Sequence, residues 1–289
     1  MTQWKLGTGA YSSLVGYTWP TNEPPSVQDV MTGHYNTLVQ VNYQDISNYN
    51  AFGIGSQKIP ISGMLSSSSE RDNLRAVARR SNINTSGDVV SEPLRLYMGV
   101  NDKFYYVLNA TYSQPETTED MGWYPYRITF DCYDPFSYED AVTDYDNGVT
   151  IGDPVNSVGT SGTMINGGNA YCFPYFEITN SNATPVTALT ITDYTGDAVG
   201  NVLTISSCSI AQGKYITVYQ GLGDGKVWGS VVGDDDGANL ASDAGTLSGT
   251  KIVWAGSATA RKIRVTFTAG GGASGSTGTF YVHCRERHW

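Results

Sequence analysis

The sequence is poor in the residue types on which catalysis and metal binding depend. It has only three histidines and four cysteines among 289 residues, and no two cysteines are spaced as C-x-x-C. No H-E-x-x-H motif, nucleophile elbow or phosphate-binding loop occurs, and no Cys/His spacing is typical of a metal site. We therefore predict that the chain is not an enzyme and binds no cofactor.

Long apolar runs are also missing. No stretch approaches the ~18 apolar residues of a membrane-spanning helix, and the start M-T-Q-W-K has no apolar core of a signal peptide. We expect neither a membrane span nor a secretory leader. The scattered cysteines are then expected to be buried, reduced thiols in a protein made in a reducing cytosol. They are Cys132, Cys172, Cys208 and Cys284.

Positive charge is scarce. The chain has 17 Lys+Arg against 27 Asp+Glu, for a net charge of −10, which argues against a nucleic-acid-binding surface. The imbalance is concentrated in residues 1–150, with 9 Lys+Arg and 17 Asp+Glu, against 8 and 10 in residues 151–289. Two interpretations stay open: solvated acidic loops, or an acidic surface that repels passing DNA.

The residues that are abundant favour β structure. Gly, Ser, Thr, Tyr and Val outweigh the strong helix formers, and an apolar share of 40% can fill real cores. In the stretch Y-P-Y-R-I-T-F-D-C-Y-D-P-F-S-Y at 124–138, apolar and polar residues alternate, as in a strand with one buried face. Asp134-Pro135 ends it, because proline has no amide hydrogen for the ladder.

The first domain is predicted at residues 54–140, a β-sheet or sandwich domain with one α-helix. Residues 1–53 are expected to be an extended arm with possible strands, as part of this domain. Serines at 66–69 suit a helix N-cap, and apolar residues follow at helical spacing, so we predict a helix from about Ser69 to Arg80. Strands before and after it would let the helix cover one face of the sheet.

The second domain is predicted at residues 171–289, after a Gly-rich linker at 141–170. Eight short β-rich runs with turn signals between them indicate a β-sandwich or jelly roll. The clearest is K-I-R-V-T-F, in which Ile263, Val265 and Phe267 alternate with polar residues. The fold class is therefore mostly β, with a helix-bearing first domain and a C-terminal sandwich.

Two weaker site candidates lie in this second domain. Trp228 and Trp254 could form a sugar-stacking platform, although a tryptophan in a sandwich is more often core. The run Asp234–Asp236 could bind calcium, but the sequence lacks the closing glutamate of a calcium loop, and an acidic β-turn is the ordinary explanation. Both alternatives stay open at this stage.

Four stretches together resemble the distal tail (Dit-like) proteins of long-tailed (siphovirus) bacteriophages. In that family a strand ending in G-x-L precedes a helix, a P-L-x-L strand follows, and a strand reading I-T-F-x-C-x-D-P-F/Y closes the domain. The second half is similar in outline to the family's galectin-like domain. The matching stretches are I-P-I-S-G-M-L at 59–65, E-R-D-N-L-R-A-V-A-R-R at 70–80, E-P-L-R-L-Y at 92–97 and the 126–138 strand.

The resemblance implies a structural virion protein at the tip of a phage tail, made in the cytoplasm of a host bacterium. Its copies would form a ring, usually a hexamer, that joins the tail-tube protein to the tail-tip hub protein and anchors receptor-binding or fibre proteins. Genome DNA would pass through the lumen without specific binding. The acidic loop is then expected near the lumen or a ring contact, and the closing motif at the domain junction. The loop residues are Glu116, Glu119 and Asp120, and the motif residues are Phe130, Asp134, Pro135, Phe136 and Tyr138.

Two alternatives have different consequences. The sandwich could make the chain a carbohydrate-binding adhesin, or the chain could be a tail-tube subunit. An adhesin would bind glycans saturably and a tube subunit would polymerise into filaments, whereas a terminal adaptor would form a closed ring.

Overall fold

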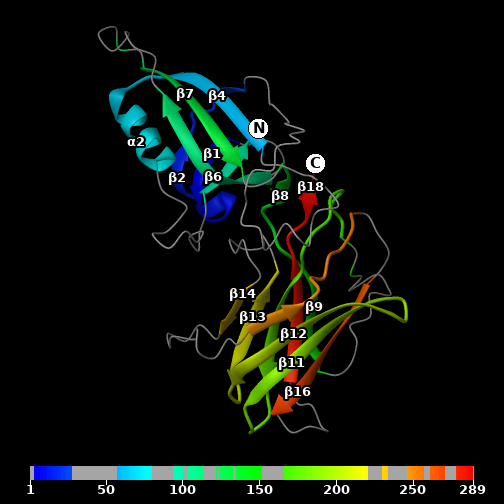
Figure 1. Cartoon of the computed structure of the whole chain (residues 1–289). Helices are drawn as coiled ribbons and strands as arrows, with labels where there is room; N and C mark the ends of the chain where they lie inside the picture. Colours follow the sequence, from blue (N-terminus) through cyan, green and yellow to red (C-terminus); the bar gives the residue numbers. More distant parts are fainter. Residues whose placement is uncertain are drawn as a thin grey trace. The chain divides into compact units, whose positions relative to one another are not determined.

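A computed structural model of the chain is drawn in Figure 1. It describes residues 3–27, 57–79, 94–99, 103–113, 122, 124–132, 135–151, 164, 166–220, 230–233, 246–256, 261–270 and 278–288. The chain divides into two compact units, Met1–Ala141 and Val142–His288. Strands dominate both units, and the described residues contain one α-helix, so the mostly β fold with a helix in the first domain is confirmed.

The first unit is built on one antiparallel sheet. Its strands follow the order β2-β1-β5-β6-β7-β4-β3, and β8 pairs with β6 outside that path. The elements are β1 (Trp4–Thr8), the 3-10 helix η1 (Tyr11–Ser13), β2 (Val15–Thr18), β3 (Ser26–Val27), β4 (Gln57–Leu65), α2 (Ser68–Ala78), β5 (Leu94–Met98), β6 (Lys103–Ser113), β7 (Tyr124–Cys132) and β8 (Ser137–Glu139).

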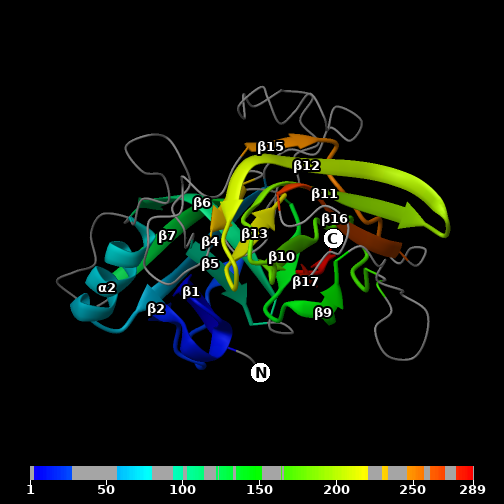
Figure 2. The same ribbon diagram turned by 90° about the horizontal axis from the view of Figure 1, so that it is seen from below.

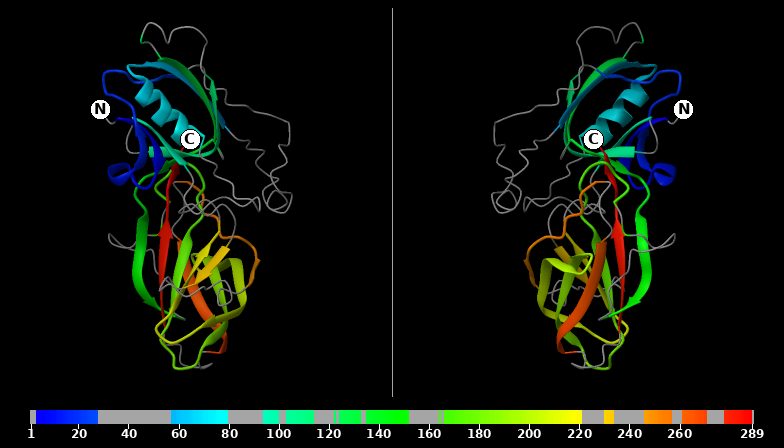
Figure 3. Two further views of the ribbon diagram at one scale, coloured as in Figure 1. Left: turned by 90° about the vertical axis from the view of Figure 1, so that its left-hand side faces the viewer. Right: turned by 90° about the vertical axis from the view of Figure 1, so that its right-hand side faces the viewer.

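Helix α2 forms where the sequence predicts it. The hydroxyl of Ser67 accepts a hydrogen bond from the amide of Glu70 at 3.2 Å, which satisfies one of the free amides of the first turn. Leu74 and Ala78 are buried in the core of the unit. Figure 3 shows the helix, in cyan, lying along one face of the sheet. It ends at Ala78, two residues before the predicted end, and Arg79 forms the C-cap.

The first residues of the chain are part of this sheet. Residues 1–53 are predicted as an arm with possible strands, and within them β1 pairs with both β2 and β5. Leu6 and Trp19 are buried, and the indole N–H of Trp19 donates a hydrogen bond of 2.7 Å to the hydroxyl of Tyr126. This bond joins residues 107 positions apart, so no local sequence pattern could have indicated it.

Two of the family-like stretches lie side by side in this sheet. Strands β4 and β7 pair without a bulge from Gln57 opposite Cys132 to Leu65 opposite Tyr124. Gly63 lies directly opposite Tyr126, and a Cβ atom added at Gly63 would lie only 2.6 Å from the tyrosine hydroxyl. The glycine of the G-x-L pattern therefore makes room for the ring that accepts the Trp19 bond.

Replacing Gly63 with alanine is expected to destabilise the first unit by roughly 1–3 kcal/mol, because the new methyl group would displace the buried Tyr126 ring. Urea unfolding of the purified protein measures the change. The matched control is the neighbouring Met64→Ala, whose side chain is 42% exposed and should change stability by no more than about 0.5 kcal/mol. Equal effects of the two substitutions would contradict this packing.

The second unit is a sandwich of two antiparallel sheets. One has the order β14-β13-β10-β17-β9 and the other β15-β12-β11-β16, and Figure 2 shows the long β11–β12 pair. The strands are β9 (Thr143–Thr150), β10 (Tyr175–Asn180), β11 (Val186–Thr195), β12 (Ala198–Ile210), β13 (Tyr215–Tyr219), β14 (Ser230–Gly233), β15 (Thr246–Gly249), β16 (Arg261–Gly270) and β17 (Gly278–Cys284). The short strand β18 (Arg287–His288) belongs to neither of these two sheets.

One apolar core lies between these sheets. Phe176, Ile178 and Phe280 contribute from one sheet, and Ile191 and Val265 contribute from the other. The alternation that the sequence shows in K-I-R-V-T-F is confirmed for Ile263 and Val265, which are fully buried, while Phe267 is partly buried against the same core. Inward and outward residues alternate along these strands because successive side chains point to opposite faces.

The stretch 141–170, predicted as a linker, contains a strand. Residues Thr143–Thr150 form β9, which pairs with β17 at the edge of its sheet. Tyr145 is buried and Val149 packs against the core. The aspartates on either side of Tyr145 give the segment the composition of a loop. Strand β9 needs only one buried face, however, so an apolar residue at alternate positions is sufficient.

Candidate assembly surfaces

The part of the chain that the structure describes contains no candidate metal site. No group of three His, Cys, Asp or Glu side chains there could hold a metal ion. None of the helices in that part has the length and apolar character needed to cross a membrane. Other candidate features of the first unit are the partly or fully buried residues 135–140 at its end, its sheet edges and a recess beside helix α2, and the second unit adds a row of aromatic rings and a buried carboxyl group.

Asp140 connects three segments at the end of the first unit. Its carboxylate accepts hydrogen bonds from the Tyr97 hydroxyl at 2.5 Å and from the Tyr11 amide at 2.9 Å. The Arg95 guanidinium lies 3.5 Å away. Burial, and then the hydrogen bond to Asp140, raise the pKa of Tyr97 well above its ordinary value, so the tyrosine stays a donor. Asp140 therefore ties η1 and β5 to the last residues of the unit.

The closing motif supplies the aromatic packing beside Asp140. Phe130, Phe136 and Tyr138 are fully buried, and Tyr138 stacks on Phe104 at 5.8 Å between ring centroids and 21° between planes. Tyr138 also meets Tyr106 edge-on at 4.9 Å. Pro135 lies at the bend before β8, and Asp134 lies outside the described residues. The unit boundary at Ala141 follows three residues after Tyr138, and a role of this motif at a domain junction stays a prediction.

Strand β2 is a sheet edge with an exposed apolar side chain. Within the described residues β2 pairs only with β1, and Val15 at its start is 76% exposed. The Trp19 amide donates to the Trp4 carbonyl. Because hydrogen-bonded and non-hydrogen-bonded pairs alternate along antiparallel strands, the amides of Gly16 and Thr18 point away from β1. An outward row of amides beside an exposed valine is suited to pairing with another chain.

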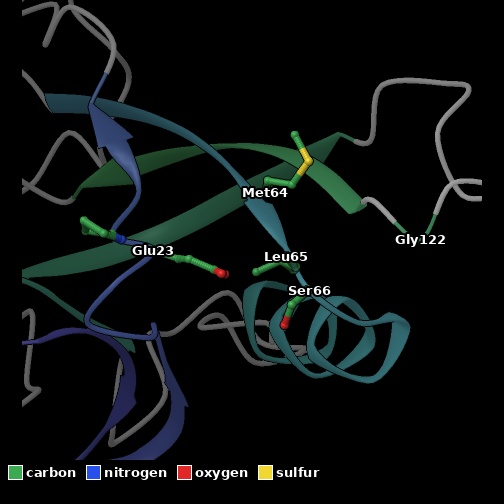
Figure 4. A pocket seen from close by; sticks show the side chains of 6 residues that line it. Glu23, Met64, Leu65, Ser66 and Gly122 are labelled. Atoms are coloured by element: carbon green, nitrogen blue, oxygen red, sulfur yellow. The ribbon is translucent and has the colours of Figure 1, made fainter.

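A recess of about 500 Å³ lies where β4 meets the start of helix α2. Figure 4 shows the side chains of Glu23 and Leu65 pointing toward one another in it, with Ser66 at the helix end. The lining also includes Met64, which is 42% exposed. With one carboxylate and no cluster of polar groups directed into it, this recess has the character of a surface hollow rather than a small-molecule site.

A row of rings crosses the outward face of one sheet of the second unit. Tyr175 stacks on Tyr219 at 5.3 Å and on His283 at 4.7 Å, with interplanar angles of 27° and 21°. His283 continues the row through a 2.6 Å hydrogen bond between its Nδ1 and the carboxylate of Asp144 on β9. Because both faces of the Tyr175 ring are occupied by neighbouring rings, the row stabilises the pairing of four strands and offers little face for a sugar.

The predicted sugar platform is not supported at Trp254. Its side chain is 1% exposed, it packs edge-on against Tyr145 at 5.3 Å, and its backbone pairs with Cys172. The large apolar surface of this side chain is buried in the core, the more common position of a tryptophan in a β-sandwich. Trp228 lies outside the described residues, as do the run Asp234–Asp236 and the acidic loop of Glu116, Glu119 and Asp120.

Asp193 is a buried carboxyl group that sequence analysis missed, since nothing in T-I-T-D-Y marks it. It is 1% exposed and lies 3.1 Å from the guanidinium of Arg261. Removal from water raises the pKa of Asp193 above its ordinary value of 3.8, and Arg261 offsets part of that rise.

The second unit is therefore expected to lose stability as pH rises from 3.8 through the folded pKa of Asp193, because the folded state favours the protonated carboxyl. Asp193→Asn removes this titration. Thermal unfolding of both proteins across that range is the measurement. The melting temperature of the wild type relative to D193N should fall with rising pH, and a difference that is flat or increases would contradict the assignment.

The comparisons with known proteins find similarity in structure only. No protein-family model matches the chain, and no curated protein matches it in sequence. A crystal structure of the phage SPP1 Dit protein (gp 19.1), described as a paradigm of the hub adsorption apparatus in phages that infect Gram-positive bacteria, is similar with a TM-score of 0.47 and 13% identity. The similarity covers 98% of each chain.

Two structures of the phage P2 baseplate are also similar. Both are in the activated conformation, one with Ca and one with Sr. Their TM-scores are 0.44 and 0.43 and their identities are 10% and 11%, with 97% of each chain covered in both cases. At this level the similarity concerns the chain trace, and a functional proposal has to rest on this chain's own residues.

Proposed function

We propose that this chain is a structural protein of a bacteriophage tail, whose copies close into a ring at the distal end of the tail. The ring joins the tail tube to the tail-tip hub and presents its sandwich domains for attachment of receptor-binding parts. DNA passes through its lumen without specific binding. The chain acts through its shape and contacts, and no catalytic step is part of the proposal.

The observation that carries the proposal is how the family-like stretches fit together. Residues 57–65 and 124–132 are paired strands, helix α2 packs on the same sheet, and residues 94–98 form β5 in it. Residues of two of these stretches contact each other directly, since Gly63 of the G-x-L pattern lies opposite Tyr126 of the closing strand. The four stretches that resemble one family, and follow its order along the chain, thus pack together in one structure. Unrelated β patterns that matched by chance would have no reason to do so.

Ring closure needs a surface on one copy that meets a different surface on the next. Strand β2, with its outward amides and the exposed Val15, is our choice for one of these surfaces. The second surface lies elsewhere on the first unit. Among the described strands, none pairs with the outer edge of β2, where Val15 lies. In the proposed ring, a second copy of the chain pairs with this edge.

The charge of the chain fits a channel wall. A net charge of −10 repels the phosphate backbone, and no counterions would be released by contact, so DNA would not be held during exit. The acidic loop of Glu116, Glu119 and Asp120 is proposed to face the lumen or a ring contact.

Replacing all three acidic residues of this loop with Gln and Asn is expected to leave the fold intact and to slow DNA release from assembled particles.

Light scattering coupled to size exclusion tests ring formation in solution. The expected mass is that of a closed oligomer, six times 31.2 kDa for a hexamer, and it should stay constant over a wide range of loading concentrations. A protein that elutes as a single subunit at every concentration contradicts the proposal. Long filaments would favour the tail-tube alternative instead.

The adhesin alternative is separated by a glycan array. Burial of Trp254 removes one of the two side chains on which sugar stacking was predicted. We expect no saturable glycan binding by the purified protein. Strong binding by a chain that remains monomeric would replace the adaptor proposal with the adhesin.

A further inference from the structure

Two of the four cysteines converge in the second unit. The Sγ atom of Cys284, at the end of β17, donates a hydrogen bond of 2.6 Å to the Sγ atom of Cys172, although the residues are 112 positions apart. Both side chains are fully buried. Cys208 lies in the same core but bonds to the Val186 carbonyl instead, and Cys132 lies in the other unit. The pairing of Cys172 with Cys284 is therefore the one that the fold specifies.

Both cysteine backbones are fixed by hydrogen bonds. Cys172 exchanges two backbone hydrogen bonds with Trp254, at 2.9 and 3.0 Å. Cys284 pairs with Thr143 on β9. A disulfide forms without strain only where two Cβ atoms already approach from suitable directions, and here the sheet brings the two sulfur atoms into contact.

We propose that Cys172 and Cys284 are a disulfide-forming pair that joins strand β17 to the segment before β10 when the protein meets an oxidant. The co-reactant is a low-molecular-weight disulfide such as oxidised glutathione. One cysteine thiolate attacks it, forming a mixed disulfide and releasing one thiol. The second cysteine then attacks the mixed disulfide, forms the protein S–S bond and releases the second thiol, so two protein thiols are oxidised as one disulfide is reduced.

The closed fold makes this reaction slow. Burial raises the pKa of Cys284 well above its ordinary value, and the thiolate is the species that attacks a disulfide. The reaction must therefore proceed through local opening of β17, and its rate should increase in denaturant too dilute to unfold the unit. This separates the pair from an exposed redox thiol, which would react at once.

Formation of the bond should raise the melting temperature of the second unit. A cross-link between residues 112 positions apart removes much of the conformational entropy of the unfolded chain. For a unit of this size the expected shift is on the order of 10 °C. The inference concerns the second unit alone and does not depend on the proposed ring.

The full-length protein tests this directly. It is incubated with oxidised glutathione in dilute urea, denatured, alkylated with N-ethylmaleimide and weighed by intact mass spectrometry. None of the four cysteines is in a disulfide before oxidation, and two of them should escape alkylation afterwards. In the matched control Cys208→Ala the pair should still form, leaving one cysteine to alkylate. In Cys284→Ala or Cys172→Ala no internal bond can form, so each of the three remaining cysteines should carry either N-ethylmaleimide or a glutathione that no second cysteine displaces, and both additions are seen in the intact mass.

Two results would overturn the proposal. One is full alkylation of the wild type after oxidation under conditions in which hydrogen exchange shows that β17 opens. The other is an internal disulfide, with no glutathione added to the mass, that survives Cys284→Ala or is lost in Cys208→Ala, since either would assign the bond to a different pair. If one single variant fails to fold, the other member of the pair provides the same test.

Discussion

Replacing Asp140 with alanine is expected to lower the free energy of unfolding of the first unit by about 3 kcal/mol. The carboxylate accepts hydrogen bonds from the Tyr97 hydroxyl and the Tyr11 amide and lies against Arg95. Without it, the guanidinium loses its carboxylate partner while largely buried, and the Tyr11 amide loses its acceptor. A buried group left unpaired costs more than the hydrogen bond itself contributed.

The measurement is hydrogen–deuterium exchange during urea unfolding, followed on peptides from β5 and β6. Asp72→Ala is the control, because the Asp72 side chain beside Arg71 is 62% exposed, and a salt bridge with an exposed partner contributes at most about 1 kcal/mol. If D140A and D72A unfold at the same urea concentration, the contacts of Asp140 do not stabilise the end of the first unit as proposed.

Replacing Val15 with glutamate is expected to abolish assembly while leaving each subunit folded. A charge at an exposed sheet edge discourages pairing with another strand, and the same device protects natural edges from aggregation. Val15 is 76% exposed, so the subunit itself should lose little stability. Light scattering should show the mass falling from that of the closed oligomer to 31.2 kDa, with an unchanged circular dichroism spectrum.

The chain offers a matched control for this substitution. Val199 in the second unit is 63% exposed, and the proposal gives ring formation to the first unit. Val199→Glu should therefore leave the oligomer intact. Disassembly by V199E and not by V15E would move the ring contact to the sandwich, and disassembly by both would point to a nonspecific effect of added charge.

The local features of this fold were predictable from the sequence. Helix α2 combines a serine cap with Leu74 and Ala78 at helical spacing, and each of these signals lies within about a dozen residues. Strand β7 shows its two faces in the alternation of Ile128 and Phe130 with polar neighbours. Such elements are visible because propensity, pattern and capping agree over one short window.

Features that depend on contacts between distant residues were not predictable. The Trp19–Tyr126 hydrogen bond and the contact of Cys172 with Cys284 each join strands that the chain brings together only on folding. The segment of β9 is predicted as a linker because the aspartates around Tyr145 obscure the alternation of apolar and polar residues, although Tyr145 is buried. For Trp254 the sequence left sugar binding and core packing open, and only its burial decides between them.

The proposed function depends above all on the assembly of copies of this chain into a closed ring. Negative-stain electron microscopy of the purified protein tests it most directly, because the shape of the particle is seen without any assumption about mass. We expect annular particles of uniform size with a central opening, which V15E should convert to single subunits. Fields of separate, compact subunits at concentrations well above those of the light-scattering experiment would contradict the account.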